Sequence, residues 1–341
     1  MTKYLKEIFI ALALCISGAW AGDFEDGVLA SEKGDYAKAF KSFKSAAISG
    51  SATAQYNLGI MYGKGQGVVQ DYAEAVRWYK LAVAQGHASA QLNLGFMYSN
   101  GRGVVQDYTE SMRLYKLAAA QGDADAQFNI GIRYDNGQGV VQDYAEAVRW
   151  YKLAAAQGFA KAQFNLGFMY SNGQGVVQDY AAAVRWYKLA AAQGLVDAQF
   201  NLGTRYDSGL GVVQDYAEAA RWYKLAAVQG LADAQSNIGF MYGAGQGVVQ
   251  DYAEAVRWYK LAAVQGNANA QSNLAFMYGN GQGVVQDYIR AHMWYNLAAV
   301  TGDADTVKNR DIVARKMTTQ QIAEAQKLAR ECQARNFKNC D

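Results

Sequence analysis

Side chains that could carry out catalysis or bind a metal are few and widely spaced in this sequence of 341 residues. His87 and His292 lie far apart, and no cluster of His, Cys, Asp or Glu has the spacing of a metal site. No Ser-x-x-Lys sequence occurs, which argues against a penicillin-type acyl enzyme. The Gly-Gln-Gly segments lack the preceding strand that a nucleotide-binding fingerprint requires. We therefore expect neither an enzyme nor a cofactor.

An asparagine that recurs every 36 residues is the first candidate for binding chemistry. Its copies are Asn57, Asn93, Asn129, Asn165, Asn201, Asn237, Asn273 and Asn309. Asparagine is a poor helix former, so its repetition inside an expected helix needs a reason. The amide could hold the main chain of a bound peptide. It could equally satisfy the buried backbone of a loop in the neighbouring copy.

The second candidate is the set of positions at which the repeated copies differ. Lys161, Phe164 and Phe168 stand at i, i+3 and i+7, so they share one face of an expected helix. A varied aromatic stripe along a stack of repeats suggests a partner surface; the alternative is packing between neighbouring helices. The residues that we predict to contact a protein or peptide partner are Phe128, Arg133, Lys161, Phe164, Phe168, Phe200, Arg205, Phe240, Asn129, Asn165 and Asn201.

These positions belong to a repeat of 36 residues that extends over most of the chain. Its Asp-Tyr start occurs eight times, at Asp35, Asp71, Asp107, Asp143, Asp179, Asp215, Asp251 and Asp287. In the copy from Asp143 to Gln178, Asp143 is a good N-cap, an apolar stripe follows at helical spacing, and Gly158 ends the first helix. A second helix is expected to stop before Ser171. The sequence therefore predicts an all-α stack of helical hairpins.

Four further expectations concern how these hairpins pack. Trp150 and Leu153 lie off the main stripe and should give the first helix a second contact side. Gly167 should let a neighbouring helix approach closely. Val176 and Val177 should pack beneath the glycine turn. The charged side chains Glu146, Arg149 and Lys152 favour a solvated face, with groove-lining charge as the alternative.

The repeat also resembles a known family. The pattern Ala-x-x-Trp-Tyr-x-x-Ala-Ala-x-x-Gly, then Ala-Gln-x-x-Leu-Gly-x-Met-Tyr, then Gly-x-Gly-Val is similar to the Sel-one-like repeats, which are relatives of the tetratricopeptide repeats. The resemblance implies eight repeats over residues 35–316, a right-handed αα superhelix, and an adaptor role in protein complexes. The complete absence of proline departs from the family pattern. Some cysteine-rich relatives are linked to β-lactam binding, which leaves a β-lactam-active protein as one alternative function.

Both ends of the repeated region should be capped. Residues 22–34 should form an N-terminal capping helix, and residues 317–341 a C-terminal one that starts with Thr318 and Gln321 as a capping box. Cys332 and Cys340 are the two cysteines left after loss of a leader, and in an oxidising compartment they would form a disulfide. The alternative is two free thiols.

Residues 1–21 have the pattern of a cleaved signal peptide, with Lys3 and Lys6, an apolar run and an Ala19-Trp20-Ala21 cleavage site. We expect export to the periplasm of a Gram-negative bacterium, or secretion, without stable membrane insertion afterwards. The net charge of +2 does not indicate a nucleic-acid partner. We therefore expect an exported scaffold for a protein or peptide, with an envelope glycan-binding module as the alternative that the tyrosines and the tryptophan column suggest.

Overall fold

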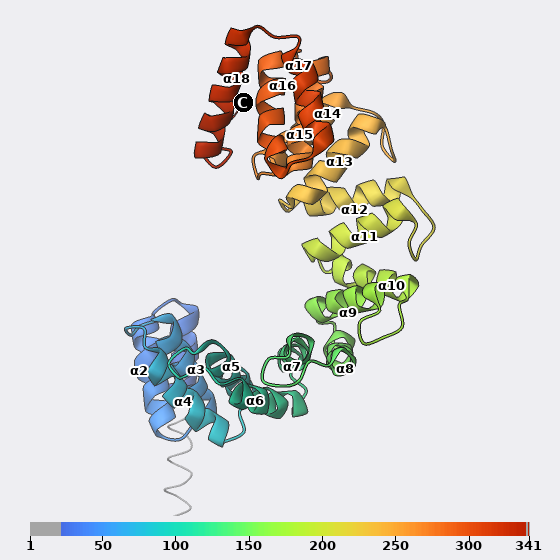
Figure 1. The fold of residues 1–341 in the computed structure, drawn as a ribbon. Coiled ribbons are helices and arrows are strands. Elements are labelled where there is room, and N and C mark those ends of the chain that lie inside the picture. Colours follow the sequence, from blue (N-terminus) through green and yellow to red (C-terminus); the bar gives the residue numbers. More distant parts are fainter. Residues whose placement is uncertain (1–21, 339, 341) are drawn as a thin grey trace, which may run out of the picture. The chain divides into compact units, whose positions relative to one another are not determined.

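The computed structural model describes residues 22–338 and 340, and every regular element in that part of the chain is a helix (Figure 1). The contacts divide the chain into two compact units. The first reaches to Ala162 and includes Gln174–Val176, and the second holds Gln163–Gly173 and continues from Val177. Residues 1–21, where a signal peptide is predicted, lie outside the described part.

The described helices form eight consecutive pairs, which confirms the all-α repeat architecture. The first helices of the pairs are α2 (Tyr36–Ile48), α4 (Tyr72–Ala84), α6 (Tyr108–Ala120), α8 (Tyr144–Ala156), α10 (Tyr180–Ala192), α12 (Tyr216–Val228), α14 (Tyr252–Ala263) and α16 (Tyr288–Ala298). The second helices are α3 (Ala52–Lys64), α5 (Ala88–Asn100), α7 (Ala124–Asn136), α9 (Ala160–Asn172), α11 (Val196–Ser208), α13 (Ala232–Ala244), α15 (Ala268–Asn280) and α17 (Ala304–Ala314).

The first helix of each pair begins at an aspartate, as the pattern predicts. In α8 the Asp143 carboxylate accepts hydrogen bonds from the backbone N–H groups of Ala145 and Glu146. The Glu146 side chain forms an ion pair with Arg149 at 3.2 Å on the solvent side. The helix ends at its C-cap Gln157. The next residue, Gly158, has a φ of +86°, a conformation that glycine adopts readily.

The second helix and its loop differ from expectation in two details. Helix α9 continues through Ser171 to Asn172, because Gly173 with φ +68° ends it in the left-handed conformation. Val176 is half-buried, but Val177 is 88% exposed, so the prediction that both valines pack beneath the turn is wrong for Val177.

The core is built mainly from small residues and tyrosine. Ala147, Tyr151 and Leu166 are fully buried, as their helical spacing predicts. In the tryptophan column, Trp258 is buried at 3% exposed, whereas Trp150 is half-buried. Leu153, in contrast, is 46% exposed, so our expectation that it contacts a neighbouring repeat is wrong.

A row of buried glutamines links successive repeats. Gln91 is 4% exposed, and its side-chain oxygen accepts a hydrogen bond of 2.8 Å from Gln121, which lies 30 residues later in the next repeat. Equivalent bonds connect Gln85 to Gln55 and Gln265 to Gln235. The amides therefore satisfy one another within the stack.

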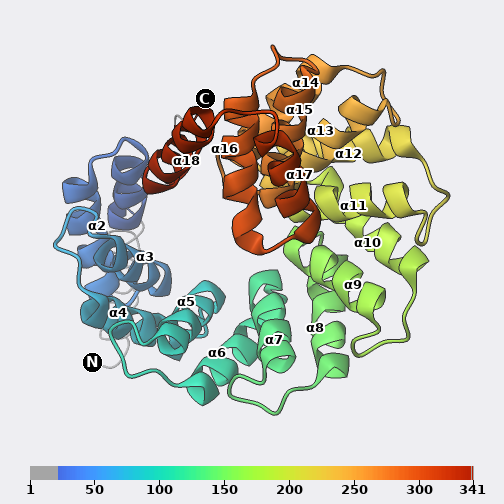
Figure 2. The same cartoon turned by 45° about the horizontal axis from the view of Figure 1, so that its top comes forward.

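The described ends carry additional helices. Residues 22–32 are helical, and Phe24 packs against Phe43 of α2 with ring centroids 5.6 Å apart. At the other end α18 (Thr319–Ala334) lies beside α16, as both views show (Figure 2). Thr318 and Gln321 form the expected capping box at its start. Among the described residues, no helix combines the length and apolar character needed to cross a bilayer.

Candidate functional site

The junction between consecutive repeats is the feature from which a binding site can be built. At a junction, the second helix of one repeat packs on the first helix of the next, and a glycine permits the contact. A Cβ added to Gly167 would lie 2.5 Å from the Tyr187 ring, so the expected close approach at Gly167 is confirmed. Each junction thus places a tyrosine beside the second helix. The residues around that tyrosine determine whether a cavity remains at the junction.

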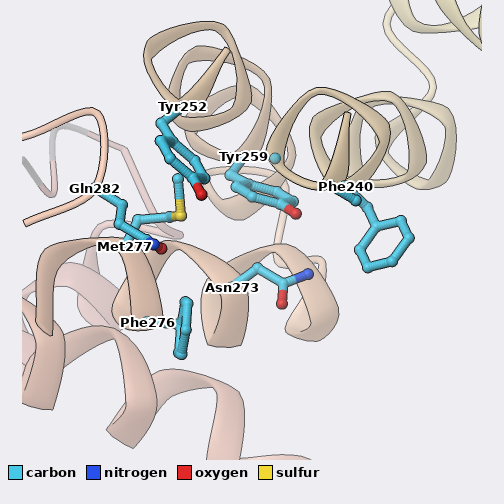
Figure 3. A pocket seen from close by; sticks show the side chains of 9 residues that line it. Phe240, Tyr252, Tyr259, Asn273, Phe276, Met277 and Gln282 are labelled. Carbon is cyan, nitrogen blue, oxygen red and sulfur yellow. The ribbon is translucent and has the colours of Figure 1, made fainter. Parts of the chain in front are cut away.

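A cavity of about 200 Å³ lies at the junction of α13, α14 and α15; we call it the C-terminal pocket. Its walls are Phe240, Gly243 and Ala244 from α13, Tyr252 and Tyr259 from α14, Asn273, Phe276 and Met277 from α15, and Gln282 from the following loop. In Figure 3 the hydroxyl groups of both tyrosines point toward the space above α15. The pocket is therefore mostly apolar with a few polar groups at defined points, as small binding sites usually are.

The Tyr259 hydroxyl is the most informative polar group in the C-terminal pocket. The residue is only 3% exposed, yet its hydroxyl has no hydrogen-bond partner among the described residues. Burial raises the pKa of Tyr259, so the hydroxyl stays protonated at neutral pH and can donate a hydrogen bond. The hydroxyl is not among the fully buried polar atoms that lack a partner, so it faces the open pocket, where a ligand with an acceptor could bind it.

A second cavity of about 360 Å³, the polar cavity, lies next to the C-terminal pocket and shares Phe240 and Asn273 with it. Its other walls are Ser236, Asn237, Asn269, Ser272, Asp303 and Thr306. Ser272 and Thr306 lie 3.3 Å apart through their hydroxyl oxygens. Amides and hydroxyls of this kind match the donors and acceptors of a peptide backbone.

Two changes in the repeat remove neighbours of Tyr259 at these two cavities. In α11 the ring of Phe200 packs on Tyr223 of the next repeat at 5.7 Å, whereas α13 carries Ser236 at the equivalent position. Similarly, Asp207 accepts a hydrogen bond from the Tyr223 hydroxyl, but its equivalent is Gly243. Tyr259 has therefore lost both a ring neighbour and a hydroxyl partner.

A repeat-equivalent cavity of about 390 Å³, the N-terminal pocket, lies at the junction of α3, α4 and α5. It is lined by Tyr56, Ile60, Gly63, Lys64, Tyr72, Tyr79, Asn93, Phe96, Met97 and Arg102. Nine of these ten residues match the nine walls of the C-terminal pocket when the numbering is shifted by 180, which is five repeats. The same structural position thus forms a pocket twice.

Two intervening junctions are filled by arginine. Arg133 replaces the methionine of the pocket wall, is 6% exposed, and donates to Ser99. Its guanidinium carbon lies 4.8 Å from the centre of the Tyr108 ring. Arg205 donates to Ser171 in the same way. The residues that these arginines contact are equivalent to residues that line the pockets. The arginine side chain therefore occupies the space that is open in the pockets.

The structure divides the predicted partner-contacting residues into two groups. Phe128, Phe164 and Phe200 are half-buried, and each ring packs on a tyrosine of the next repeat. With Arg133 buried and Arg205 half-buried, these side chains fill junctions rather than present the surface that we expected. Only the residues named next are exposed.

Lys161, Phe168 and Phe240 are exposed, with Phe168 at 48% and Phe240 at 53%. Of these, Phe240 lines both the C-terminal pocket and the polar cavity. The stripe predicted from repeat variation therefore lies at two depths. The position of Phe164 packs against the core, and the positions of Lys161 and Phe168 reach solvent.

The asparagine row follows neither of the two expected patterns throughout. Asn129 and Asn201, both half-buried, donate at 2.8 Å to carbonyl oxygens of their own helices, those of Asp125 and Asp197. Asn165 is half-buried in α9. Glutamines of the loop satisfy the end of the second helix instead: Gln142 donates to the carbonyl oxygen of Asp135, in the last turn of α7. Asn93 and Asn273 line pockets.

Several site residues escaped prediction from the sequence, notably Tyr259, Gly243 and the polar pair Ser272 and Thr306. Tyrosine occurs at this position in seven of the eight repeats, the first having Phe43, and gave no signal of its own. The useful signal was the coincidence of Gly243 with Ser236, which removes two neighbours of the same ring. It becomes visible only when contacts across a junction are known.

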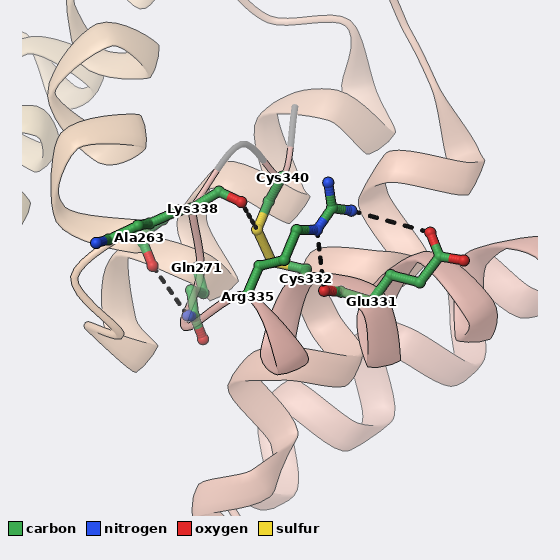
Figure 4. The surroundings of a disulfide bond; sticks show 7 residues. All are labelled: Ala263, Gln271, Glu331, Cys332, Arg335, Lys338 and Cys340. Carbon is green, nitrogen blue, oxygen red and sulfur yellow. Dashed lines mark hydrogen bonds and ion pairs between the residues drawn. A yellow bond between two sulfur atoms is a disulfide. The ribbon is translucent and has the colours of Figure 1, made fainter.

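The C-terminal cysteines lie within bonding distance in the structure, outside these cavities. The sulfur atoms of Cys332 and Cys340 are 1.97 Å apart, and the bond closes the end of α18 back on itself (Figure 4). Nearby, Gln271 donates at 3.0 Å to the Ala263 carbonyl oxygen. Elsewhere among the described residues, no group of three or more His, Cys, Asp or Glu side chains could hold a metal ion.

Known proteins share this architecture. The Sel1 repeat model matches residues 52–87, 88–123, 124–159, 160–195, 196–231, 232–267 and 268–299. A Sel1 repeat protein from Oxalobacter formigenes is 35% identical, with 85% of each chain covered and a TM-score of 0.65. The protective antigen c5321 of uropathogenic Escherichia coli, which has an SLR fold, is 29% identical over 95% of this chain and 86% of its own, with a TM-score of 0.48. Comparison with curated proteins gave no match. The chain belongs to the Sel1 repeat family.

Proposed function

We propose that this protein is an exported scaffold that holds a protein partner through an extended segment bound along α13, α15 and α17. Sel1 repeat proteins are helical scaffolds that typically bind other proteins. The observation that carries the proposal is the pair of adjoining cavities that share Phe240 and Asn273. An apolar side chain of the partner enters the C-terminal pocket, and its backbone meets the amides and hydroxyls of the polar cavity.

The energetics of such a site favour a few buried contacts over a large area. Phe240 and Phe276 are about half exposed, at 53% and 50%, and could bury apolar surface against a partner. A partner carbonyl could accept a hydrogen bond from the Tyr259 hydroxyl, which lines the pocket. The helices already hold these side chains in place, so little ordering is required on binding.

Export is the second part of the proposal. It is supported by the charge and apolar pattern of residues 1–21 and by the Cys332–Cys340 bond, which suits an oxidising compartment. We expect the mature chain to start at Gly22. N-terminal sequencing of protein recovered from the cell envelope tests this, and an intact Met1 in that fraction would contradict it.

Site-specific photocrosslinking tests the binding site. A photoreactive residue at Phe276 should trap a protein in cells that export the chain. The same residue at Leu261, which is 42% exposed on α14 and outside both cavities, is the matched control and should trap nothing. Asn273→Ala combined with Phe240→Ala should reduce trapping at Phe276. Equal trapping at Phe276 and Leu261 would argue against this groove.

The polar cavity also supports a second candidate, an envelope glycan-binding module, because amides, hydroxyls and the Phe240 ring surround it. The tryptophan column gives this candidate little support: Trp78, Trp258 and Trp294 are buried. Its other members, Trp150, Trp186 and Trp222, are half-buried. Calorimetric titration with peptidoglycan fragments distinguishes the two: saturable binding that Asn273→Ala weakens would favour the glycan.

A further inference from the structure

The N-terminal pocket differs from its C-terminal equivalent chiefly in charge. Lys64 stands where the C-terminal pocket has Ala244, and Arg102 stands where it has Gln282. Both cations are exposed, and neither side chain forms a hydrogen bond or an ion pair with the described residues. Two unpaired positive charges therefore lie at the entrance of one pocket, whereas the equivalent pocket is neutral there.

Aromatic side chains surround one of these cations. The guanidinium carbon of Arg102 lies 5.4 Å from the centre of the Phe96 ring and 5.9 Å from that of Tyr72. Cation–π contacts of this kind favour a guanidinium placed over the rings while its N–H groups stay available. Arg102 can thus form a charge-assisted, bidentate hydrogen bond with a carboxylate at the entrance.

The interior of the N-terminal pocket suits an apolar group with one acceptor. Ile60, Phe96 and Met97 supply apolar walls. Tyr79 is 5% exposed, and its hydroxyl accepts a hydrogen bond of 3.4 Å from Asn93, so its own proton remains available to a ligand. Burial raises the pKa of Tyr79 to about 12, which keeps that proton in place at neutral pH.

We propose that the N-terminal pocket is a second, separate binding site, which takes an apolar side chain of a peptide that has a carboxylate next to it. The apolar group lies between Ile60, Phe96 and Met97, and the carboxylate pairs with Lys64 and Arg102. The carboxylate is either a chain terminus or an Asp or Glu side chain. This site rests on the protein-binding character of the fold and is independent of the groove on α13, α15 and α17.

Three labelled peptides of identical Gly-Ser sequence test the proposal by fluorescence anisotropy with the mature protein. One ends in phenylalanine with a free carboxylate, one ends in phenylalanine amide, and one ends in Phe-Glu amide. A carboxylate peptide should bind about tenfold more tightly than the plain amide, as one charge-assisted hydrogen bond would give. The preference should weaken in high salt. Tighter binding of the first or third peptide identifies a terminal or side-chain carboxylate, respectively.

The repeat itself provides the matched variants. Lys64→Ala with Arg102→Gln copies the C-terminal pocket, so it should fold normally and lose the carboxylate preference. Ala244→Lys with Gln282→Arg should confer that preference on the C-terminal pocket. Asn273→Ala with Phe240→Ala, which impairs the other groove, should leave carboxylate binding unchanged. Equal affinity for all three peptides, no binding at millimolar concentration, or an unchanged preference in the Lys64→Ala and Arg102→Gln variant would overturn the proposal.

Discussion

Two kinds of repeat junction arise from nearly the same 36 residues. At the junction of α5, α6 and α7, the buried Arg133 side chain reaches back and donates to Ser99. At the junction of α13, α14 and α15, Met277 and Gly243 stand at the equivalent positions, and a cavity of about 200 Å³ remains. The difference shows that two positions decide whether a junction is filled or open, with the helices unaltered.

Raising the pH should have the largest effect on stability, because it deprotonates the tyrosine that both kinds of junction share. Burial raises the pKa of Tyr79 and Tyr223 to about 12, against about 10 for an unfolded chain. Their contribution to stability is complete below pH 10 and is lost as the pH rises toward 12. A shift of this size corresponds to a few kcal/mol for each tyrosine. We expect circular dichroism to report unfolding in this interval, together with tyrosinate absorbance.

The control for the pH experiment is Tyr79→Phe, which removes one of these titrating groups. It should lose less stability between pH 10 and 12 than the parent protein does. Tyrosinate absorbance that develops fully near pH 10, before any unfolding, would show that the rings are accessible and would contradict the burial argument.

Removal of the filling side chain should have the next largest effect. Arg133→Ala empties the junction and leaves Ser99 without its donor, so the free energy of unfolding should fall by about 3 kcal/mol. Urea unfolding measures the loss. Arg133→Met combined with Ser99→Gly copies the open junction of Met97 and Gly63, and should cost only about 1 kcal/mol. Equal losses in the two variants would mean that the arginine has no specific packing role.

The reverse change should close the C-terminal pocket. Gly243→Ser has room, because the nearest atom to an added Cβ is 3.7 Å away, and Met277→Arg supplies the filling side chain. The combined variant should melt at about the parent temperature while the protein trapped from Phe276 falls about tenfold. The same pair of changes in the other pocket, Gly63→Ser with Met97→Arg, is the control and should not affect this trapping.

The smallest effect is expected from restoring a ring contact. Ser236→Phe should pack on Tyr259 as Phe200 packs on Tyr223 and should raise stability by about 1 kcal/mol. Thermal unfolding should shift upward by a few degrees, and the polar cavity should lose its ligand. A lower melting temperature would show that the cavity cannot hold the ring.

Local rules made the helices predictable, whereas the junctions depend on residues far apart in the sequence. Asp143 and Gly158 mark the ends of a helix through their own conformations, so the repeat could be predicted from spacing alone. The burial of Phe164 could not be predicted in this way, because it depends on Tyr187, which lies in the next repeat. Leu153 and Val177 were misassigned for a related reason: their apolar character does not show which neighbour is close enough to cover them.

The C-terminal disulfide has a consequence for how the molecule opens. In a linear stack each repeat is stabilised by its neighbours, so unfolding starts at an end, where one neighbour is missing. The Cys332–Cys340 bond holds the turn that carries Phe337, whose ring lies next to Gly266. Fraying at that end is therefore restrained, and the array should unzip from the helix at residues 22–32 and α2. Amide hydrogen exchange should be fastest there, and reduction of the disulfide should allow exchange to spread from both ends.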